Sequence, residues 1–117
     1  MLIVEDDPDI RGALADRFRS EGYAAAVASN GADAVNYLED NERPCAVLVD
    51  LLMPGVVGMS LLDYMRADKR LASIPVAIIS ASPQLAPAGY RVFPKPFDMK
   101  ALVAFVRHTE AAAGNVK

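Results

Sequence analysis

A short apolar run that ends in one acid constrains the fold of this chain more than any other stretch. Val47-Leu48-Val49 carries no polar side chain, Asp50 follows it directly, and Pro54-Gly55 comes soon after. A continuous apolar run is typical of a strand buried on both faces, as strands are in parallel sheets. The Pro-Gly pair marks a turn. The pattern predicts a central strand that brings the Asp50 carboxylate to the carboxyl-terminal edge of a sheet, where open α/β proteins bind ligands.

The rest of the chain alternates between short apolar stretches and helical patterns. Strands are expected at residues 1–4, 23–28, 74–80 and 91–94, and helices at residues 8–21, around 34–38, at 60–68 and after 98. Consecutive strands that are joined by helices pair in parallel, and right-handed crossovers place the helices on both faces of the sheet. We therefore expect one α/β domain over residues 1–117, built on a doubly wound parallel sheet.

Composition argues against several classes of function. The 117 residues suffice for one hydrophobic core, and a formal net charge of -3 with a pI near 5.0 gives no basic field for nucleic acid. No apolar run is long enough to cross a bilayer. The single cysteine, Cys45, is expected as a free thiol in the core, which suits a reducing compartment. We expect a cytoplasmic domain that binds neither membranes nor nucleic acid directly.

Polar side chains stand at the ends of the other predicted strands. Glu5 and Asp6 follow the first strand, Ser80 ends the fourth, and Lys95 follows the fifth. Because parallel strands share one carboxyl-terminal edge, these side chains are expected to converge with Asp50. Three carboxylates held together repel one another unless a cation neutralises them. Mg²⁺ prefers oxygen ligands and this edge offers no His or Cys for zinc, so the sequence predicts a Mg²⁺ site, with Mn²⁺ as the alternative ion.

An acidic nucleophile, a divalent cation, an ammonium group and a hydroxyl together favour phosphoryl transfer to an aspartate. Catalysis of that reaction consists mainly of positioning and of neutralising the phosphoryl oxygens. Asp50, the one acid on the central strand, is the expected nucleophile. Taken alone, a strand-end aspartate is more often a turn former, and Ser80 or Lys95 alone is an ordinary residue, so the prediction depends on their convergence. Asp7 is expected to cap the first helix and His108 to have a structural role at the surface or half-buried.

Four motifs carry a resemblance to a known family. They are Leu2-Ile3-Val4-Glu5-Asp6-Asp7, Val49-Asp50-Leu51-Leu52-Met53-Pro54-Gly55 with Gly58, Ser80-Ala81, and Lys95-Pro96-Phe97. Each motif alone is weakly specific, but together, in this order, the chain resembles the receiver domain of two-component response regulators. The resemblance covers nearly the whole chain. It implies a flavodoxin-like fold, which is a doubly wound, five-stranded parallel sheet in the order 2-1-3-4-5 with helices on both faces.

The resemblance also implies a role for each residue at the edge. Asp50 is implied as the phosphoacceptor, Ser80 as the switch hydroxyl and Lys95 as the phosphoryl-binding lysine. The metal ligands that it implies are Glu5, Asp6, Asp50 and the main-chain carbonyl of Leu52. The peptide bond between Lys95 and Pro96 is expected to be cis, which the low intrinsic cost of a cis proline permits.

The sequence departs from the family pattern in its last third. Val92 stands where the family has an aromatic switch residue, and Phe93 is the nearest aromatic substitute. Pro94 removes an amide donor, which suits only an edge strand. Residues 81–90 are too few for the usual connection between the fourth and fifth strands, and two prolines interrupt any helical pattern there. We expect the family's fourth helix to be reduced or absent, with a loop or a single turn in its place.

Three functions fit these residues, in decreasing order of support. The first is a phosphorylation-dependent switch of a two-component phosphorelay, in which a histidine kinase or histidine phosphotransfer protein phosphorylates Asp50 and an unknown downstream protein responds. Such a domain is not an enzyme beyond its own phosphorylation and dephosphorylation. The alternative is a degenerate receiver that acts as a constitutive protein-interaction module. A metal-dependent phosphatase is third, because Leu52 stands where that enzyme needs a second acid.

Overall fold

The computed structural model describes residues 1–50 and 58–114, which form alternating strands and helices. In chain order the elements are β1 (Leu2–Val4), α1 (Pro8–Ser20), β2 (Ala26–Ala28), α2 (Gly31–Asp40), β3 (Val47–Asp50), α3 (Gly58–Ala67), α4 (Lys69–Ala72), β4 (Val76–Ser80), the 3-10 helix η1 (Pro83–Leu85), β5 (Arg91–Pro94) and α5 (Met99–Gly114). The predicted alternation of strands and helices is confirmed.

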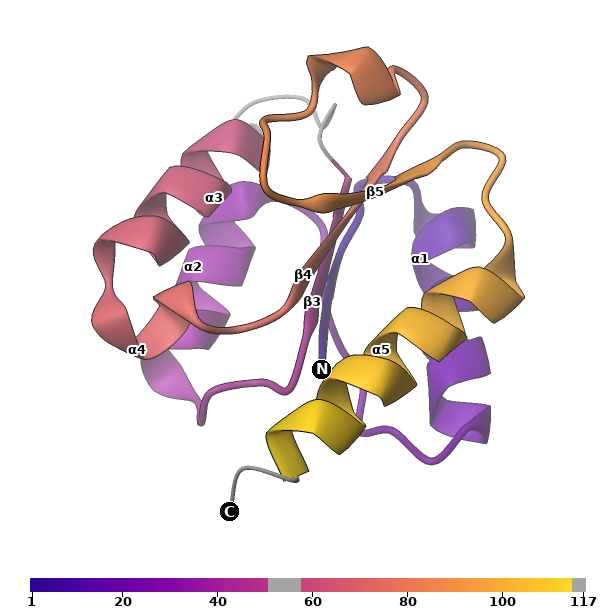
Figure 1. Ribbon diagram of the computed structural model, residues 1–117, viewed down its shortest axis with the longest axis horizontal. Helices are drawn as coiled ribbons and strands as arrows, with labels where there is room; N and C mark the ends of the chain where they lie inside the picture. The colour runs from indigo at the N-terminus through magenta and orange to yellow at the C-terminus, as the bar shows by residue number, and fades with distance from the viewer. Residues whose placement is uncertain (51–57, 115–117) are drawn as a thin grey trace.

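The five strands form one parallel sheet in the order β2-β1-β3-β4-β5, as the sequence predicts. Helices α1 and α5 cover one face of the sheet, and α2, α3 and α4 cover the other (Figure 1). The carboxyl-terminal edge of the sheet faces the top of Figure 1, where η1 also lies. In the register of this sheet Asp50 lies beside Ile79 and Ser80 beside Pro94, so consecutive strands end close together at this edge.

Two apolar clusters hold the helices to the sheet. On the side of α2, α3 and α4, Leu38 and Leu61 pack with Val49 of β3. On the side of α1 and α5, Phe18 and Leu48 pack in the second cluster. All four residues of β3 are buried, and its three apolar side chains alternate between these two clusters, with Val47 and Val49 in the first and Leu48 in the second. The apolar run before Asp50 is therefore the central, doubly covered strand that the sequence predicts.

Local signals set several helix ends. The Oδ1 of Asp7 accepts hydrogen bonds from the amides of Asp9 (2.8 Å) and Ile10 (3.2 Å), so the predicted cap of α1 is confirmed. Gly22 follows α1 with a φ of +95°, a left-handed conformation that glycine adopts without strain. At the start of α5, the Oδ1 of Asp98 accepts from the amide of Lys100 at 2.9 Å. The Lys95-Pro96 peptide bond is cis, as expected.

The connection between β4 and β5 contains only η1, one turn of 3-10 helix. The expectation of a reduced fourth helix is confirmed, and β5 is an edge strand in which Pro94 can lack an amide donor. Three local predictions are wrong. Helix α3 begins at Gly58, before the expected Ser60; the short helix α4 was not predicted; and Cys45 is exposed because the core begins with the next residue, Ala46. No helix in the described ranges is long and apolar enough to cross a membrane.

Candidate functional site

Buried polar side chains gather at the carboxyl-terminal edge of the sheet. Among the described residues that are polar or charged, Glu5, Asp50 and Ser80 are buried, with 1%, 5% and 0% of their surface exposed. Each stands at the end of a different strand, β1, β3 or β4. Burying a charged or polar group costs free energy unless it is paired or hydrogen-bonded. Their common location therefore points to a functional site.

Lys95 joins two of these residues. Its Nζ lies 2.9 Å from the Oδ2 of Asp50 and 3.0 Å from the Oε1 of Glu5, although Glu5 is 90 positions away in the sequence. Its backbone amide donates to the carbonyl of Ser80 at 2.8 Å, which extends the pairing of β4 and β5 by one residue. The expected convergence of these four residues is thus present in the structure.

The exposed carboxylate of Asp6 completes a cluster of three acids. One carboxylate oxygen from each of Glu5, Asp6 and Asp50 lies within 4.8 Å of the other two. When all three are ionised, they and the ammonium of Lys95 leave two negative charges, the charge that one divalent cation neutralises. All the side-chain donors are carboxylate oxygens, which hard cations such as Mg²⁺ prefer. The cluster could therefore hold such an ion. Leu52, the other predicted metal-site residue, lies outside the described residues.

The pKa values in this cluster reflect burial and the pairing with lysine. The pKa of Glu5 is raised from 4.5 to about 7, first by burial and then by the neighbouring Asp50, whose effect is only partly offset by Lys95. For Lys95 burial works against the charged form, but the hydrogen bonds and charges of Asp50 and Glu5 outweigh it and raise the pKa of the ammonium group. Lys95 therefore stays charged at neutral pH, whereas Glu5 titrates there.

Arg11 is a contributor to this site that the sequence does not single out. It is half-buried, and its Nη1 donates to the main-chain carbonyls of Glu5 (3.0 Å) and Asp6 (3.3 Å). These bonds hold the turn between β1 and α1 from which both acids project. The only sequence signal was an arginine at the fourth position of the helix that follows the acids, which is too weak by itself.

Ser80 is hydrogen-bonded within the β4–η1 turn, and Val92 and Phe93 face opposite sides of the sheet. The Oγ of Ser80 accepts a hydrogen bond from the amide of Ser82 at 2.9 Å, so its lone pair is directed into the β4–η1 turn. Val92 packs on the cluster shared with α3, whereas Phe93 is buried on the α5 side, where its ring meets Phe105 edge-on at 5.9 Å. Because they face opposite sides of the sheet, Phe93 does not substitute for an aromatic residue at Val92.

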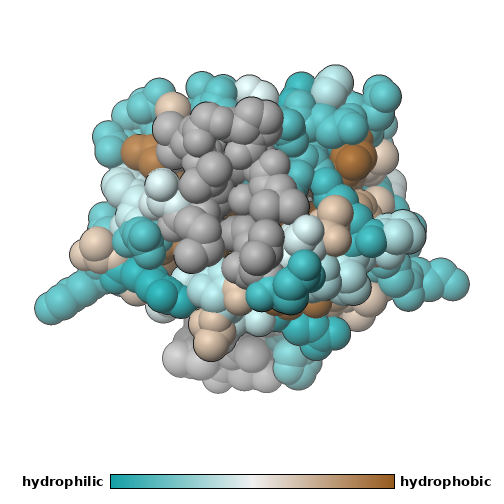
Figure 2. All heavy atoms as spheres, turned by 90° about the horizontal axis from the view of Figure 1, so that it is seen from above, coloured by the Kyte–Doolittle hydropathy of each residue, from teal (hydrophilic) through white to brown (hydrophobic). Residues whose placement is uncertain are grey.

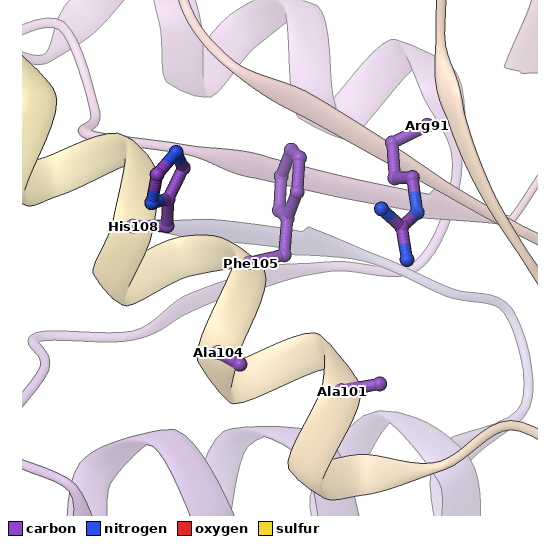
Figure 3. A pocket seen from close by; sticks show the side chains of 5 residues that line it. All are labelled: Arg91, Ala101, Ala104, Phe105 and His108. Carbon is purple, nitrogen blue, oxygen red and sulfur yellow. The ribbon is translucent and has the colours of Figure 1, made fainter.

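A separate pocket of about 320 Å³ lies between β5 and α5 and shares no residue with the acidic cluster. Arg91, Ala101, Ala104, Phe105 and His108 line it (Figure 3). His108 is exposed, as expected. Figure 2 shows the molecule from above, on the side of the carboxyl-terminal edge, where most of the coloured surface is hydrophilic. The acidic cluster, and not this apolar pocket, is therefore the candidate functional site.

A doubly wound parallel sheet with carboxylates and one lysine converging at its carboxyl-terminal edge defines a class of α/β domain that is suited to phosphoryl chemistry. The chain matches the family described as "Response regulator receiver domain" over residues 1–107. It belongs to that family, and the predicted resemblance is confirmed.

Individual relatives agree with this assignment. The chain is 33% identical to protein Rrf1 of Nitratidesulfovibrio vulgaris over 109 residues, which cover 91% of this chain and 78% of Rrf1. It is 32% identical to the DNA-binding response regulator MtrA of Mycolicibacterium smegmatis over 92% of this chain but only 48% of MtrA. The chain therefore spans about half of that longer relative. The receiver domain of the Francisella response regulator 1452 has the same fold, with a TM-score of 0.82, 26% identity and 96% of each chain covered.

Proposed function

We propose that residues 1–117 form a single receiver domain that acts as a phosphorylation-dependent switch of a two-component phosphorelay, with Asp50 as the phosphoacceptor. The observation that carries the proposal is the contact of 2.9 Å between the Asp50 carboxylate and the Lys95 ammonium, inside a cluster of three acids. An oxygen nucleophile and a cation that can bind phosphoryl oxygens therefore stand side by side.

The reaction transfers a phosphoryl group from a phosphohistidine to Asp50. A carboxylate oxygen of Asp50 attacks phosphorus, an O–P bond forms and the N–P bond breaks. The nitrogen keeps the electron pair of that bond, and the histidine leaves as neutral imidazole after taking up a proton from solvent. As charge moves onto the phosphoryl oxygens, the ammonium of Lys95 exchanges its contact with Asp50 for a contact with the phosphoryl group. The hydroxyl of Ser80 donates a hydrogen bond to the same group while its oxygen still accepts from Ser82.

Glu5, Asp6 and Asp50 are the residues that hold Mg²⁺, or Mn²⁺, in this proposal, together with the main-chain carbonyl of Leu52. When bound, the cation neutralises the acids and the incoming phosphoryl oxygens. Glu5 has to release its proton to act as a ligand, since its pKa is near 7. Arg11 keeps both Glu5 and Asp6 in place through their backbone carbonyls.

The proposed partners are a histidine kinase or a histidine phosphotransfer protein as donor and a downstream protein as target, in the cytoplasm. The domain itself binds neither membranes nor nucleic acid directly in this proposal and performs no chemistry beyond its own phosphorylation and dephosphorylation. A degenerate receiver, the alternative function, has no need for a buried acid pair held by a lysine. The complete set of Glu5, Asp6, Asp50 and Lys95 argues against it.

Labelling with acetyl phosphate tests the proposal. Intact mass spectrometry should show one added phosphoryl group in the presence of Mg²⁺, and Asp50→Asn should abolish it. Asp7→Asn is the matched control, because it removes a neighbouring exposed acid and asparagine caps a helix as well as aspartate does. Equal labelling of the Asp50→Asn variant would exclude Asp50 as the phosphoacceptor, and an unlabelled wild type would exclude the proposed switch.

A further inference from the structure

One pair of side chains ties the β4–β5 connection to α3. In the last turn of α3 the Nε of Arg66 donates to the hydroxyl of Tyr90 at 2.7 Å, and the guanidinium carbon lies 4.8 Å from the centroid of the tyrosine ring. The Nη2 of Arg66 also reaches the carbonyl of Ala88 at 3.5 Å. Arg66 is exposed and Tyr90 half-buried, so this contact holds the end of the connection at the protein surface.

Arg66 and Tyr90 lie in or next to elements that follow or precede residues of the proposed phosphorylation site in the chain. Helix α3 comes after Asp50 in the chain, and β5, which begins next to Tyr90, ends just before Lys95. Tyr90 packs on the same apolar cluster as Val92 and Ala86, on the face of the sheet that α3 covers. A shift of the β4–β5 connection therefore changes the contact between Tyr90 and Arg66.

The other end of the connection is bound to Ser80. The amide of Ser82 donates to the Oγ of Ser80 at 2.9 Å, and η1 begins at the next residue, Pro83. A hydroxyl can accept one hydrogen bond and donate another at the same time. When the Ser80 side chain moves toward a phosphoryl group on Asp50 in order to donate to it, its oxygen is displaced, and Ser82 and η1 move with that oxygen. The connection is thus held at one end by a group of the site and at the other by Arg66.

We propose that the Arg66–Tyr90 pair is a latch, closed in the unphosphorylated domain and opened when Ser80 and Lys95 close on a phosphoryl group at Asp50. The inference rests on the proposed phosphorylation of Asp50. Arg66 and Tyr90 touch no reacting atom, so they are positioning residues. Of the two ends of the connection, we expect the Arg66–Tyr90 contact to break and the Ser80 end to hold. A contact between an exposed and a half-buried side chain is weaker than the packing of β4. Linked equilibria are reciprocal, so opening the latch by mutation favours the phosphorylated conformation.

Affinity for a phosphoryl mimic tests this reciprocity. Tyr90→Phe removes the hydroxyl and keeps the ring, whereas Arg66→Gln removes the hydrogen bond and the cation over the ring. Each variant should bind beryllofluoride in the presence of Mg²⁺ about fivefold more tightly than the wild type. The double variant should gain no more than Arg66→Gln alone, because both changes open the same contact. Tyr64→Phe is the matched control, since its hydroxyl contacts Glu39 (3.3 Å) and not the connection.

The latch can also be observed directly by NMR. The Nε–H signal of Arg66 should be protected in the free wild type and lost when beryllofluoride binds. The Nε–H signal of Arg17, which donates to Glu21 at 3.0 Å on α1, should persist and serves as the internal control. If the wild type binds beryllofluoride but the variants bind it equally or more weakly, or the Arg66 signal persists, the latch is wrong and the proposed function stands. A wild type that neither binds beryllofluoride nor accepts a phosphoryl group overturns both.

Discussion

The carboxyl-terminal edge is built differently in the middle of the sheet, at β1 and β3, and toward its outside, at β4 and β5. At β1 and β3, Glu5 and Asp50 are buried and share one lysine, and β3 has a neighbouring strand on each side. The edge strand β5 has one neighbour, β4, and two of its four residues are exposed. The connection between β4 and β5 contains a single 3-10 turn. The first region is held by the core of the protein, and the second by a few surface contacts.

This difference suits the two tasks of the proposed switch. Phosphoryl transfer needs groups that are held in position before the reaction, which burial in a packed sheet provides. A change of conformation needs an element of low local stability, with few buried contacts and exposed hydrogen bonds. In this domain the two requirements are met by neighbouring strands. The four predictions below test whether the regions differ as described, from the largest expected effect to the smallest.

Replacing Lys95 should have the largest effect. Lys95→Met removes the cation that contacts Asp50 and Glu5, and should slow labelling of Asp50 by acetyl phosphate by about 100-fold, the typical loss when one stabilising donor is removed. Lys100→Met, which removes an exposed lysine from α5, should label at the wild-type rate. Unchanged labelling of the Lys95→Met variant would show that the observed contacts are structural only.

A matched pair of valines compares the packing of the two regions. Val49 of β3 is fully buried, and Val92 of β5 is half-buried on the same face of the sheet. Val49→Ala should lower the free energy of unfolding by about 2 kcal/mol, and Val92→Ala by less than about 1 kcal/mol, because the cavity at an edge can be filled by solvent. Urea unfolding measures both. Equal losses would contradict the proposed difference in packing.

The raised pKa of Glu5 makes metal binding depend on pH. Below pH 7 the carboxyl group carries a proton that a cation has to displace, so Mg²⁺ affinity should fall by up to about tenfold per pH unit from pH 7 downward and level off above it. Calorimetry in buffers of different ionisation enthalpy should detect the released proton. Glu5→Gln should bind more weakly with a flat profile between pH 6 and 8; a flat profile in the wild type would contradict the assignment.

The raised pKa of Glu5 also predicts how the stability of the metal-free domain changes with pH. The pKa of Glu5 is higher in the folded protein, about 7, than its ordinary value of 4.5. The folded state therefore binds the proton more tightly, and this stabilisation is present at low pH and lost as the pH rises through 7. Relative to Glu5→Gln, the melting temperature of the wild type should fall between pH 5 and pH 8. Added Mg²⁺ should reverse that loss in the wild type alone.

By itself, the sequence determined the order of the elements, the doubly covered strand at Val47–Asp50 and the short connection after Ser80. It also determined which strand ends carry acids, a hydroxyl and a lysine. These features follow from local periodicity and turn residues, together with the rule that parallel strands end at one edge. A resemblance in four short motifs added the family, which the comparison of the whole chain confirmed.

Tertiary structure alone decided the details that depend on distant pairs. Three such details leave no periodic signal in the sequence. They are the exposure of Cys45, the hydrogen bonds from Arg11 to the backbone of Glu5 and Asp6, and the contact of Arg66 with Tyr90. The pKa of Glu5 depends on how deeply the fold buries it and on Lys95, 90 positions away. Local patterns specify which elements form, but the environment of a side chain is set by the residues that packing brings beside it.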